Sequence, residues 1–185
     1  MLLSMRAALL FCLIASANLV EEPCRRMTAA HERAMTHFEA GRFAQAAAEL
    51  RAGYAEYHAP GLLYDEAVCH ERLGDRTRAA ALYARYIAEA GAPHDRDEVA
   101  QRVAALRLGM DGPPLEPKGV LIVRSLPPGA RIYFGERGGV PVGTTPWSGH
   151  VEGVSTLILA GDGFSDRYEV ARPRPRSVTV LDVHL

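Results

Sequence analysis

The chain has 185 residues, of which 48 % are hydrophobic, and a formal net charge of −1. This is enough apolar material for a core in one or two domains, so intrinsic disorder is not expected. The basic residues are nearly all arginine, Lys118 is the only lysine, and no block of like charge stands out, so the composition predicts no nucleic-acid partner.

The first residues have the pattern of a secretory signal peptide. Arg6 precedes an apolar run over residues 7–17, which ends on small residues before Asn18. This run is about half of the roughly 20 residues that a transmembrane helix needs, so no span is expected after cleavage. Cys12 follows bulky residues instead of the small ones typical of a lipid-attachment site. We therefore expect residues 1–17 to be a signal peptide and the rest to be exported.

Two cysteines remain after this cleavage, Cys24 and Cys69. In an oxidising compartment they could close a loop by a disulfide that stabilises the fold by roughly 3–4 kcal/mol. Cys69 also lies in a helical segment, YDEAVCHERL, where a buried thiol commonly serves as a small hydrophobic residue. The sequence leaves both interpretations open.

Residues 28–108 are rich in Ala, Leu, Arg and Glu and poor in β-branched residues, which predicts successive helices. The segment repeats itself, because GRFAQAAAELRAGYAEY from Gly41 returns as GDRTRAAALYARYIAEA from Gly74, a period of 33 residues. In each unit the glycine follows one helix, where it can adopt the left-handed conformation of a helix C-cap, and a second helix comes next. The pattern predicts two helical hairpins.

A fifth helix and a linker follow these hairpins. The segment Gly91–Pro93 interrupts the chain, and Val99, Val103 and Leu106 then recur at helical spacing, so this helix is expected to cap the array. Residues 109–118, GMDGPPLEPK, contain three prolines and two glycines and have no periodicity. They are predicted to be a linker.

Residues 119–185 contain six short β-type runs bounded by turn residues: GVLIVRS, ARIYFG, GVPVGTT, VSTLILA, RYEVA and SVTVLDVHL. We expect a small antiparallel β-sandwich. The stretch SLPPGARIYFGERGGVPVGTTP, over residues 125–146, is interpreted as turns and not as a ligand loop. Residues 127–129 are expected to turn between two strands, and Pro146 to end a strand because it cannot donate to a ladder.

The helical region resembles the tetratricopeptide repeat over about residues 28–108. The matching positions are Ala34, Gly41, Phe43, Ala46 and Leu50 in the first unit and Ala67, Gly74, Ala79 and Tyr83 in the second. One departure is Arg76, which stands where an aromatic residue is usual. The resemblance implies an α-helical array that binds peptides.

The C-terminal region resembles a PEGA domain over about residues 119–185. The similarity is carried by Pro128-Gly129-Ala130, Gly143-Thr144-Thr145-Pro146, Gly163-Phe164 and the terminal strand, with Pro128 in place of the glutamate that gives the family its name. PEGA domains recur in envelope and surface proteins. Joined to a signal peptide, both resemblances imply a scaffold in the periplasm or cell envelope of a bacterium.

The sequence shows no catalytic, cofactor or metal motif. HERAMTH resembles a zinc-protease helix, but His31 and His37 are six residues apart and therefore lie about 120° apart around a helix. The adjacent Cys69 and His70 diverge by about 100° and cannot act as nucleophile and base. Dinucleotide, phosphate-loop and serine-hydrolase motifs are absent. We therefore expect no enzyme activity.

The tetratricopeptide resemblance places a partner in the concave face that the first helix of each pair lines. The corresponding residues are His31, Met35, Phe38, Glu39, Tyr64, Val68, Glu71 and Arg72. Their mixture of aromatic, apolar and charged side chains suits a protein or peptide. Alternatively, with only two units, Phe38 and Val68 could be core beneath the capping helix, and the array could be completed by a second copy of the chain as a homo-oligomer.

Trp147, the only tryptophan, follows the Thr-Thr-Pro turn. Its indole could stack on a sugar ring, with Tyr133 and Tyr168 as further contacts, or it could cover the edge of the β core. The sequence thus predicts an exported, non-catalytic scaffold or adaptor that binds a partner protein. The alternative is a carbohydrate- or cell-wall-binding module that uses the β domain.

Overall fold

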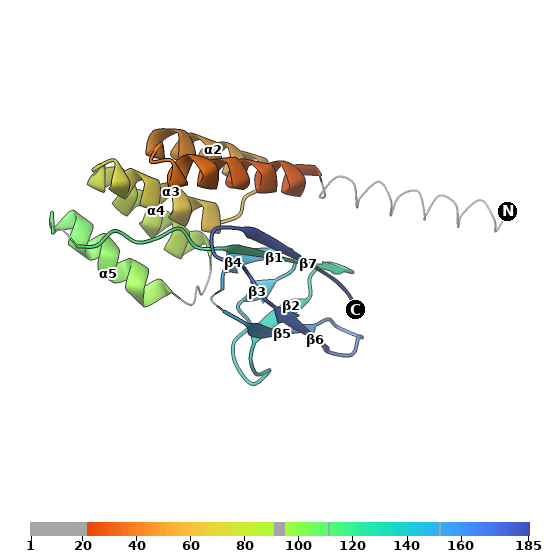
Figure 1. Cartoon of the computed structure of the whole chain (residues 1–185). Coiled ribbons are helices and arrows are strands. Elements are labelled where there is room, and N and C mark those ends of the chain that lie inside the picture. Colours follow the sequence, from red (N-terminus) through yellow and green to blue (C-terminus); the bar gives the residue numbers. More distant parts are fainter. Residues whose placement is uncertain (1–21, 91–94, 111, 152) are drawn as a thin grey trace.

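The computed structural model of the chain describes residues 22–90, 95–110, 112–151 and 153–185. It has the expected α-then-β layout, with helices in the N-terminal part and two β-sheets in the C-terminal part (Figure 1). The predicted signal peptide and the predicted chain break at residues 91–93 lie outside the described residues.

The helices follow the predicted repeat. A first helix covers residues 22–39, and the next are α2 (Phe43–Glu56), α3 (Gly61–Arg72), α4 (Arg76–Glu89) and α5 (Arg96–Arg107). Gly41 and Gly74 have positive φ angles of 70° and 77°, as predicted for C-caps. The first helix begins earlier than the repeat, and it buries Cys24 and Met27.

Small side chains allow the helices to approach closely. Buried alanines, among them Ala34, Ala46, Ala67 and Ala79, line the contacts between neighbouring helices. The rings of Tyr64 and Tyr83 meet edge to face, with centroids 5.4 Å apart. On α5, Val99, Val103 and Leu106 are buried, which confirms the predicted spacing of the fifth helix.

The β region has seven strands among the described residues. They are β1 (Val120–Leu126), β2 (Arg131–Phe134), β3 (Gly143–Thr144), β4 (Trp147–His150), β5 (Ser155–Ala160), β6 (Arg167–Ala171) and β7 (Val178–His184). One sheet has the order β4-β1-β7 and the other the order β3-β2-β5-β6. Leu121 and Val123 of the first sheet share a core with Ile132, Leu157 and Leu159 of the second, so the two sheets form a sandwich.

Two features of this sandwich differ from the prediction. It is not wholly antiparallel, because β7 pairs with β1 in parallel along seven residue pairs. Strand β4 was also not expected, since its sequence WSGH has neither alternation nor β-branched residues. It forms because its backbone pairs antiparallel with β1, from Trp147 opposite Val123 to His150 opposite Val120. Pairing between distant strands does not follow from local patterns.

Strand β1 is buried on both faces. Leu121 and Val123 belong to the sandwich core, whereas Val120 and Ile122 belong to the helical core. The first sheet therefore lies between the helices and the second sheet, in three layers (Figure 1). The helical and β units therefore pack directly against each other through β1.

The proline- and glycine-rich stretch forms turns, as predicted. Residues 127–130 connect β1 to β2, and Gly129 has a φ of 91°. The Thr145 hydroxyl oxygen accepts hydrogen bonds from the backbone N–H groups of Gly129 (3.1 Å) and Ala130 (3.0 Å). A side chain from one turn thus satisfies the backbone of the other. Within the described part of the chain, no helix has the length and apolar character needed to cross a membrane.

Candidate binding sites

The helical face predicted to bind a partner carries the linker of the same chain. Residues 112–118 run from the end of α5 back along the helices to β1 (Figure 1). The backbone N–H of Lys118 donates to Asp65 Oδ1 at 3.0 Å, and Glu116 pairs with Arg72. An extended, proline-containing segment therefore lies where a partner peptide was expected.

The eight predicted groove residues are mostly inaccessible. His31, Met35, Phe38, Tyr64 and Val68 are buried, the Glu71 side chain is covered, Arg72 is half-buried against Glu116, and Glu39 is exposed. Phe38 and Val68 are part of the helical core, which agrees with the alternative interpretation of these two residues. The face is thus not an open groove, because the linker and the β unit cover it.

Glu71, Arg102 and Tyr83 form a polar cluster below the linker. The Tyr83 hydroxyl donates to Glu71 Oε2 at 2.9 Å, and Arg102 Nε donates to Glu71 Oε1 at 2.6 Å. Arg102 also reaches the Gly112 carbonyl oxygen at 3.4 Å. The Glu71 side chain is only 2 % exposed, so burial leaves this residue unable to contact a partner.

A buried contact between a histidine and a carboxylate lies at the centre of the helical unit. His31 Nε2 is 3.1 Å from Asp65 Oδ2, and both side chains are fully buried. Because Asp65 also accepts the Lys118 N–H, its carboxylate joins the first helix, α3 and the linker. Asp65 was not predicted as a functional residue. The apolar residues that flank it in GLLYDEAVC are the sequence signal that could have indicated a buried carboxylate.

A second buried carboxylate, Asp95, connects the helical unit to the β unit. It accepts hydrogen bonds from the Tyr86 hydroxyl (2.7 Å) and the Lys118 ammonium (2.9 Å), and His150 Nδ1 of β4 lies 3.9 Å away. Burial would raise the pKa of this carboxyl, but its three partners outweigh burial and hold the pKa of Asp95 below its usual range. The His150 ring packs against Tyr64, with centroids 4.7 Å apart.

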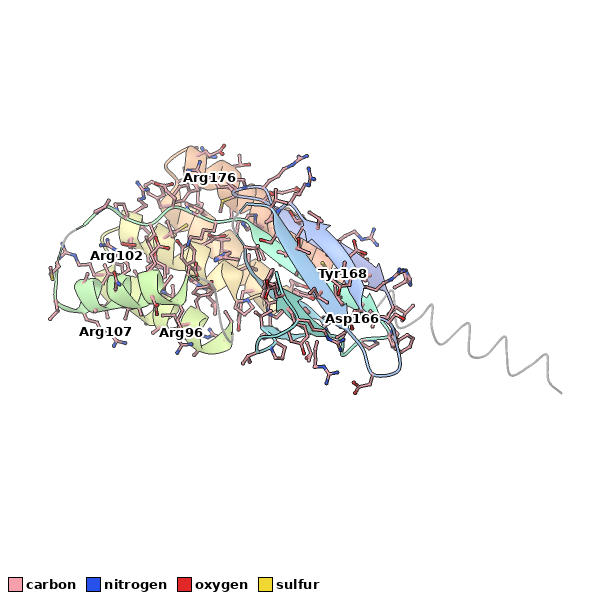
Figure 2. All side chains as sticks on the ribbon, turned by 90° about the horizontal axis from the view of Figure 1, so that it is seen from below. Arg96, Arg102, Arg107, Asp166, Tyr168 and Arg176 are labelled. Atoms are coloured by element: carbon pink, nitrogen blue, oxygen red, sulfur yellow. The ribbon has the colours of Figure 1, made fainter. Side chains whose placement is uncertain are left out.

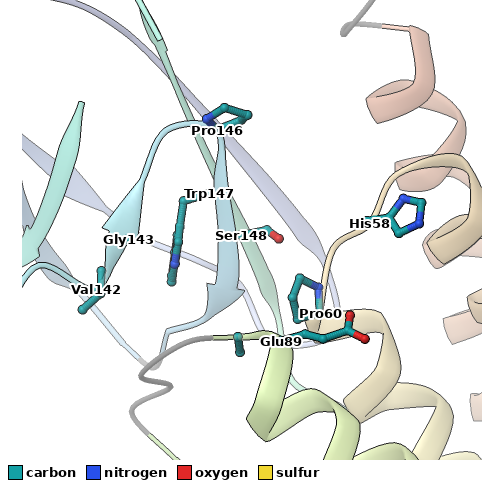
Figure 3. Close-up of a pocket in the computed structure, with 9 residues that line it drawn as sticks. His58, Pro60, Glu89, Val142, Gly143, Pro146, Trp147 and Ser148 are labelled. Carbon is teal, nitrogen blue, oxygen red and sulfur yellow. The ribbon is translucent and has the colours of Figure 1, made fainter. Parts of the chain in front are cut away.

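An open pocket of about 290 Å³ lies between the helical unit and the edge of the sandwich (Figure 3). It is lined by His58, Pro60, Glu89, Ala90, Val142, Gly143, Pro146, Trp147 and Ser148. Figure 3 shows Trp147 on one side and Pro60 and Glu89 on the other, with Ser148 between them. This pocket joins an aromatic surface to several polar groups.

The Trp147 indole is held in place by its surroundings. A Cβ atom on Gly143 would lie 2.5 Å from its ring, and one on Gly149 would lie 2.6 Å from it, so the two glycines make room for the indole. Phe134 meets it edge to face at a centroid distance of 5.7 Å. Trp147 thus partly covers the edge of the sandwich core, one of the two roles predicted for it, and it also lines the pocket.

Tyr133 and Tyr168 lie apart from Trp147. Both stand opposite Ile158 in the register of the second sheet, so the three side chains form one row on its outer face. Trp147 is instead opposite Val123, a residue of the sandwich core. The structure therefore brings together two of the three aromatic residues predicted as sugar contacts. Figure 2 shows Tyr168 at the surface of the β unit.

The histidines and cysteines do not converge. In the described residues no group of three or more His, Cys, Asp or Glu side chains could hold a metal ion. His37 is directed away from His31 and accepts a hydrogen bond from Arg42 at 2.9 Å. Cys24 and Cys69 are both buried in the helical core. Burial raises the pKa of the Cys69 thiol to about 12.

Comparison with family models, with curated proteins and with solved structures finds no match to this chain. The similarity to the tetratricopeptide repeat and to the PEGA domain therefore stays a prediction from individual sequence positions.

Proposed function

We propose that this protein is an exported, non-catalytic scaffold or adaptor of the bacterial periplasm or cell envelope. Export is supported by the signal pattern over residues 1–17, and the assignment to tetratricopeptide-like helices and a PEGA-like β unit by the motifs described above. The role of the helices in this proposal is to hold the β unit. It is supported by the linker contacts and by the packing of Val120 and Ile122 in the helical core.

The partner surface in this proposal is the outer face of the second sheet. Tyr168 and Val170 of β6 are 66 % and 52 % exposed, and Tyr133 lies half-buried on the same face, with the buried Ile158 between Tyr133 and Tyr168. Adjacent large apolar and aromatic side chains on a solvated sheet face are typical of protein interfaces. These accessible residues, named here the β6 stripe (Tyr133, Tyr168 and Val170), are the observation that carries the proposal.

The β6 stripe accounts for partner binding better than the helical face does. A partner peptide on the helical face would have to displace the linker, including the Lys118–Asp65 hydrogen bond and the Glu116–Arg72 pair. A partner on the β6 stripe displaces no described segment of the chain, since Tyr168 and Val170 are exposed. Aromatic residues also dominate the binding energy of many interfaces because they bury a large area at low entropy cost.

The test is a capture experiment with the whole chain from residue 18 as bait in envelope extract of the source bacterium. The double variant Tyr168→Ser/Val170→Ser removes the most exposed part of the stripe. The matched control is Val140→Ser/Val154→Ser, because both valines are exposed but lie outside the stripe. Circular dichroism checks that all three baits are folded.

A protein captured by wild type and control should be lost from the double variant. Its affinity, measured with purified partner by calorimetry, should fall by a factor of ten or more, which is typical for removal of an aromatic hot spot. Equal affinity for the double variant and the control would exclude the β6 stripe as the partner surface.

A further inference from the structure

We infer that the pocket between α4 and β4 binds one pyranose ring of an uncharged saccharide. The inference goes beyond the proposed adaptor role, since it concerns a different surface and a different class of ligand from the β6 stripe. It rests on an aromatic wall, a polar wall, their charge and the size of the space between them.

The aromatic wall is the Trp147 indole. Sugar rings present a face of C–H groups that packs on flat aromatic surfaces, and a large rigid side chain offers this area at low entropy cost. Gly143 and Gly149 leave the space that the indole occupies, and Phe134 packs against its edge. The wall is therefore in position before a ligand arrives, which reduces the entropic penalty of binding.

The polar wall comes from the helical unit. Glu89 Oε2 accepts a hydrogen bond from the Tyr54 hydroxyl and Glu89 Oε1 accepts one from Arg85 Nε, each at 2.5 Å. The His58 ring packs beside Tyr54 with centroids 5.0 Å apart. A carboxylate has about four acceptor positions, so each Glu89 oxygen can still accept a bond from a ligand hydroxyl. The bonds from Tyr54 and Arg85 hold the carboxylate in one orientation.

The charge of the pocket favours a neutral ligand. A lone carboxylate opposite an indole would suit a cation, because both attract positive charge. Here Arg85 already pairs with Glu89 and also lies 4.8 Å from the Tyr54 ring centroid. With the carboxylate neutralised, the remaining character is that of an aromatic face plus the donors and acceptors of Ser148 and His58. Hydroxyl-rich, uncharged rings match this combination.

The size of the pocket limits the ligand. Its volume of about 290 Å³ is at the lower end of small-molecule sites, which span roughly 300–1,000 Å³. The space therefore accommodates one ring, and its open side leaves neighbouring rings of a chain in solvent. A glycan strand is thus as acceptable as a free sugar, and the test has to separate the two.

The test uses the fact that Trp147 is the only tryptophan in the sequence. Its fluorescence reports on the pocket alone, so the mature chain is titrated with cellobiose, maltose and N,N′-diacetylchitobiose, and separately with choline as a cationic probe. We expect a saturable change in emission with at least one of the three disaccharides and none with choline. A co-sedimentation assay with purified peptidoglycan then distinguishes polymer from free sugar as the preferred ligand.

Two variants keep the fluorescent reporter. Glu89→Gln, which removes a charged acceptor, should weaken binding of the disaccharide about tenfold, and His58→Ala should weaken it less. The matched control is Glu49→Gln, because Glu49 also pairs with an arginine, Arg33, but lies outside the pocket. Trp147→Phe, measured by calorimetry, should weaken binding as well.

Failure of this inference is distinguishable from failure of the adaptor role. Tyr168→Ser/Val170→Ser should retain the full response to sugar while it loses the protein partner. The inference is overturned if no disaccharide gives a saturable response at high millimolar concentration. It is equally overturned if Glu89→Gln binds as tightly as the Glu49→Gln control, or if choline alone saturates the pocket.

Discussion

The helical and β units meet along two stretches that use similar residues in different ways. Along the linker, Asp65 and Asp95 are buried, and donors of Lys118 satisfy both carboxylates. At the pocket, Glu89 and Trp147 stand on opposite sides of an open space. Carboxylates and aromatic rings occur in both stretches. Along the linker, the chain itself supplies the hydrogen-bond donors for the carboxylates, and this closed contact of Asp65, Asp95 and Lys118 is named here the lock. At the pocket no described residue fills the space, and the residues form a candidate site.

The largest expected effect is at the centre of the lock. Asp65→Ala leaves the buried His31 without its carboxylate and the Lys118 N–H without its acceptor. A buried polar group left without its hydrogen-bond partner typically costs about 1–3 kcal/mol, so the two groups together should lower the free energy of unfolding by about 2–6 kcal/mol. Urea unfolding followed by far-UV circular dichroism measures this loss. Asp162→Ala is the control, because Asp162 pairs with Arg131 at the surface. Similar midpoints for both variants would contradict the lock.

A second prediction concerns the close approach of the two units. A Cβ atom on Gly61 would lie 2.8 Å from His150 Nε2 and 2.9 Å from Val120 Cγ2. Gly61→Ala should therefore lower the free energy of unfolding by about 1–3 kcal/mol through overpacking. The gain in helix propensity, at most about 1 kcal/mol, offsets part of this loss. Gly138→Ala should be neutral, since nothing lies within 4 Å of that position and its φ is not positive.

If Gly61→Ala were as stable as wild type, the contact between α3 and β4 would be looser than described. Nuclear magnetic resonance of the His150 ring offers an independent check, because its resonances should shift in Gly61→Ala and not in Gly138→Ala. The same comparison tests whether β4 belongs to the lock.

The helices and their caps could largely be predicted from local sequence, whereas the buried contacts of Asp65 and Lys118 could not. Gly41 and Gly74 were identified as caps because only local geometry is needed to place a left-handed residue. Asp65 was not identified, since its importance depends on the His31 and Lys118 groups that reach it from other elements. The apolar run VLIV in β1 does carry a signal, because a strand without alternation is buried on both faces.

The β unit was predicted less well, for a physical reason. Strand existence follows from β-branched runs, but pairing depends on chain topology, so the parallel neighbours β1 and β7 were expected to be antiparallel. The pocket was foreseen only through Trp147. Its other wall, with Pro60 and Glu89, comes from the helical unit, which the sequence offers no reason to bring to this strand.

A third, smaller effect should appear as a dependence on pH. The folded-state pKa of Asp95 is held below its usual range, whereas the unfolded chain titrates near about 3.9. The unfolded state therefore binds the proton more tightly, and stability from Asp95 is present above pH ~4 and lost as the pH falls towards the folded-state pKa. Asp95→Asn cannot titrate. Its melting temperature should decline less steeply than wild type in acid, and parallel declines would contradict the role of Asp95.

The smallest expected effect separates the exposed from the buried part of the linker contact. Glu116 pairs with Arg72 and Arg176, yet its side chain is 57 % exposed. Ion pairs at the surface typically contribute 0–1 kcal/mol and weaken with added salt, because water screens the charges and the side chains lose entropy. Glu116→Gln should thus lower the free energy of unfolding by less than about 1 kcal/mol, and high salt should remove the difference.

Limited proteolysis of the same variant addresses the linker directly. If buried contacts of Asp65 and Lys118 hold residues 112–118, the linker of Glu116→Gln should be cleaved about as slowly as in wild type, whereas that of Asp65→Ala should be cleaved much faster. Rapid cleavage in Glu116→Gln would mean that surface charge closes the helical face. Added salt would then open the helical face, and a partner peptide could compete with the linker for it. The difference between the closed linker contact and the open pocket would in that case depend on the salt concentration.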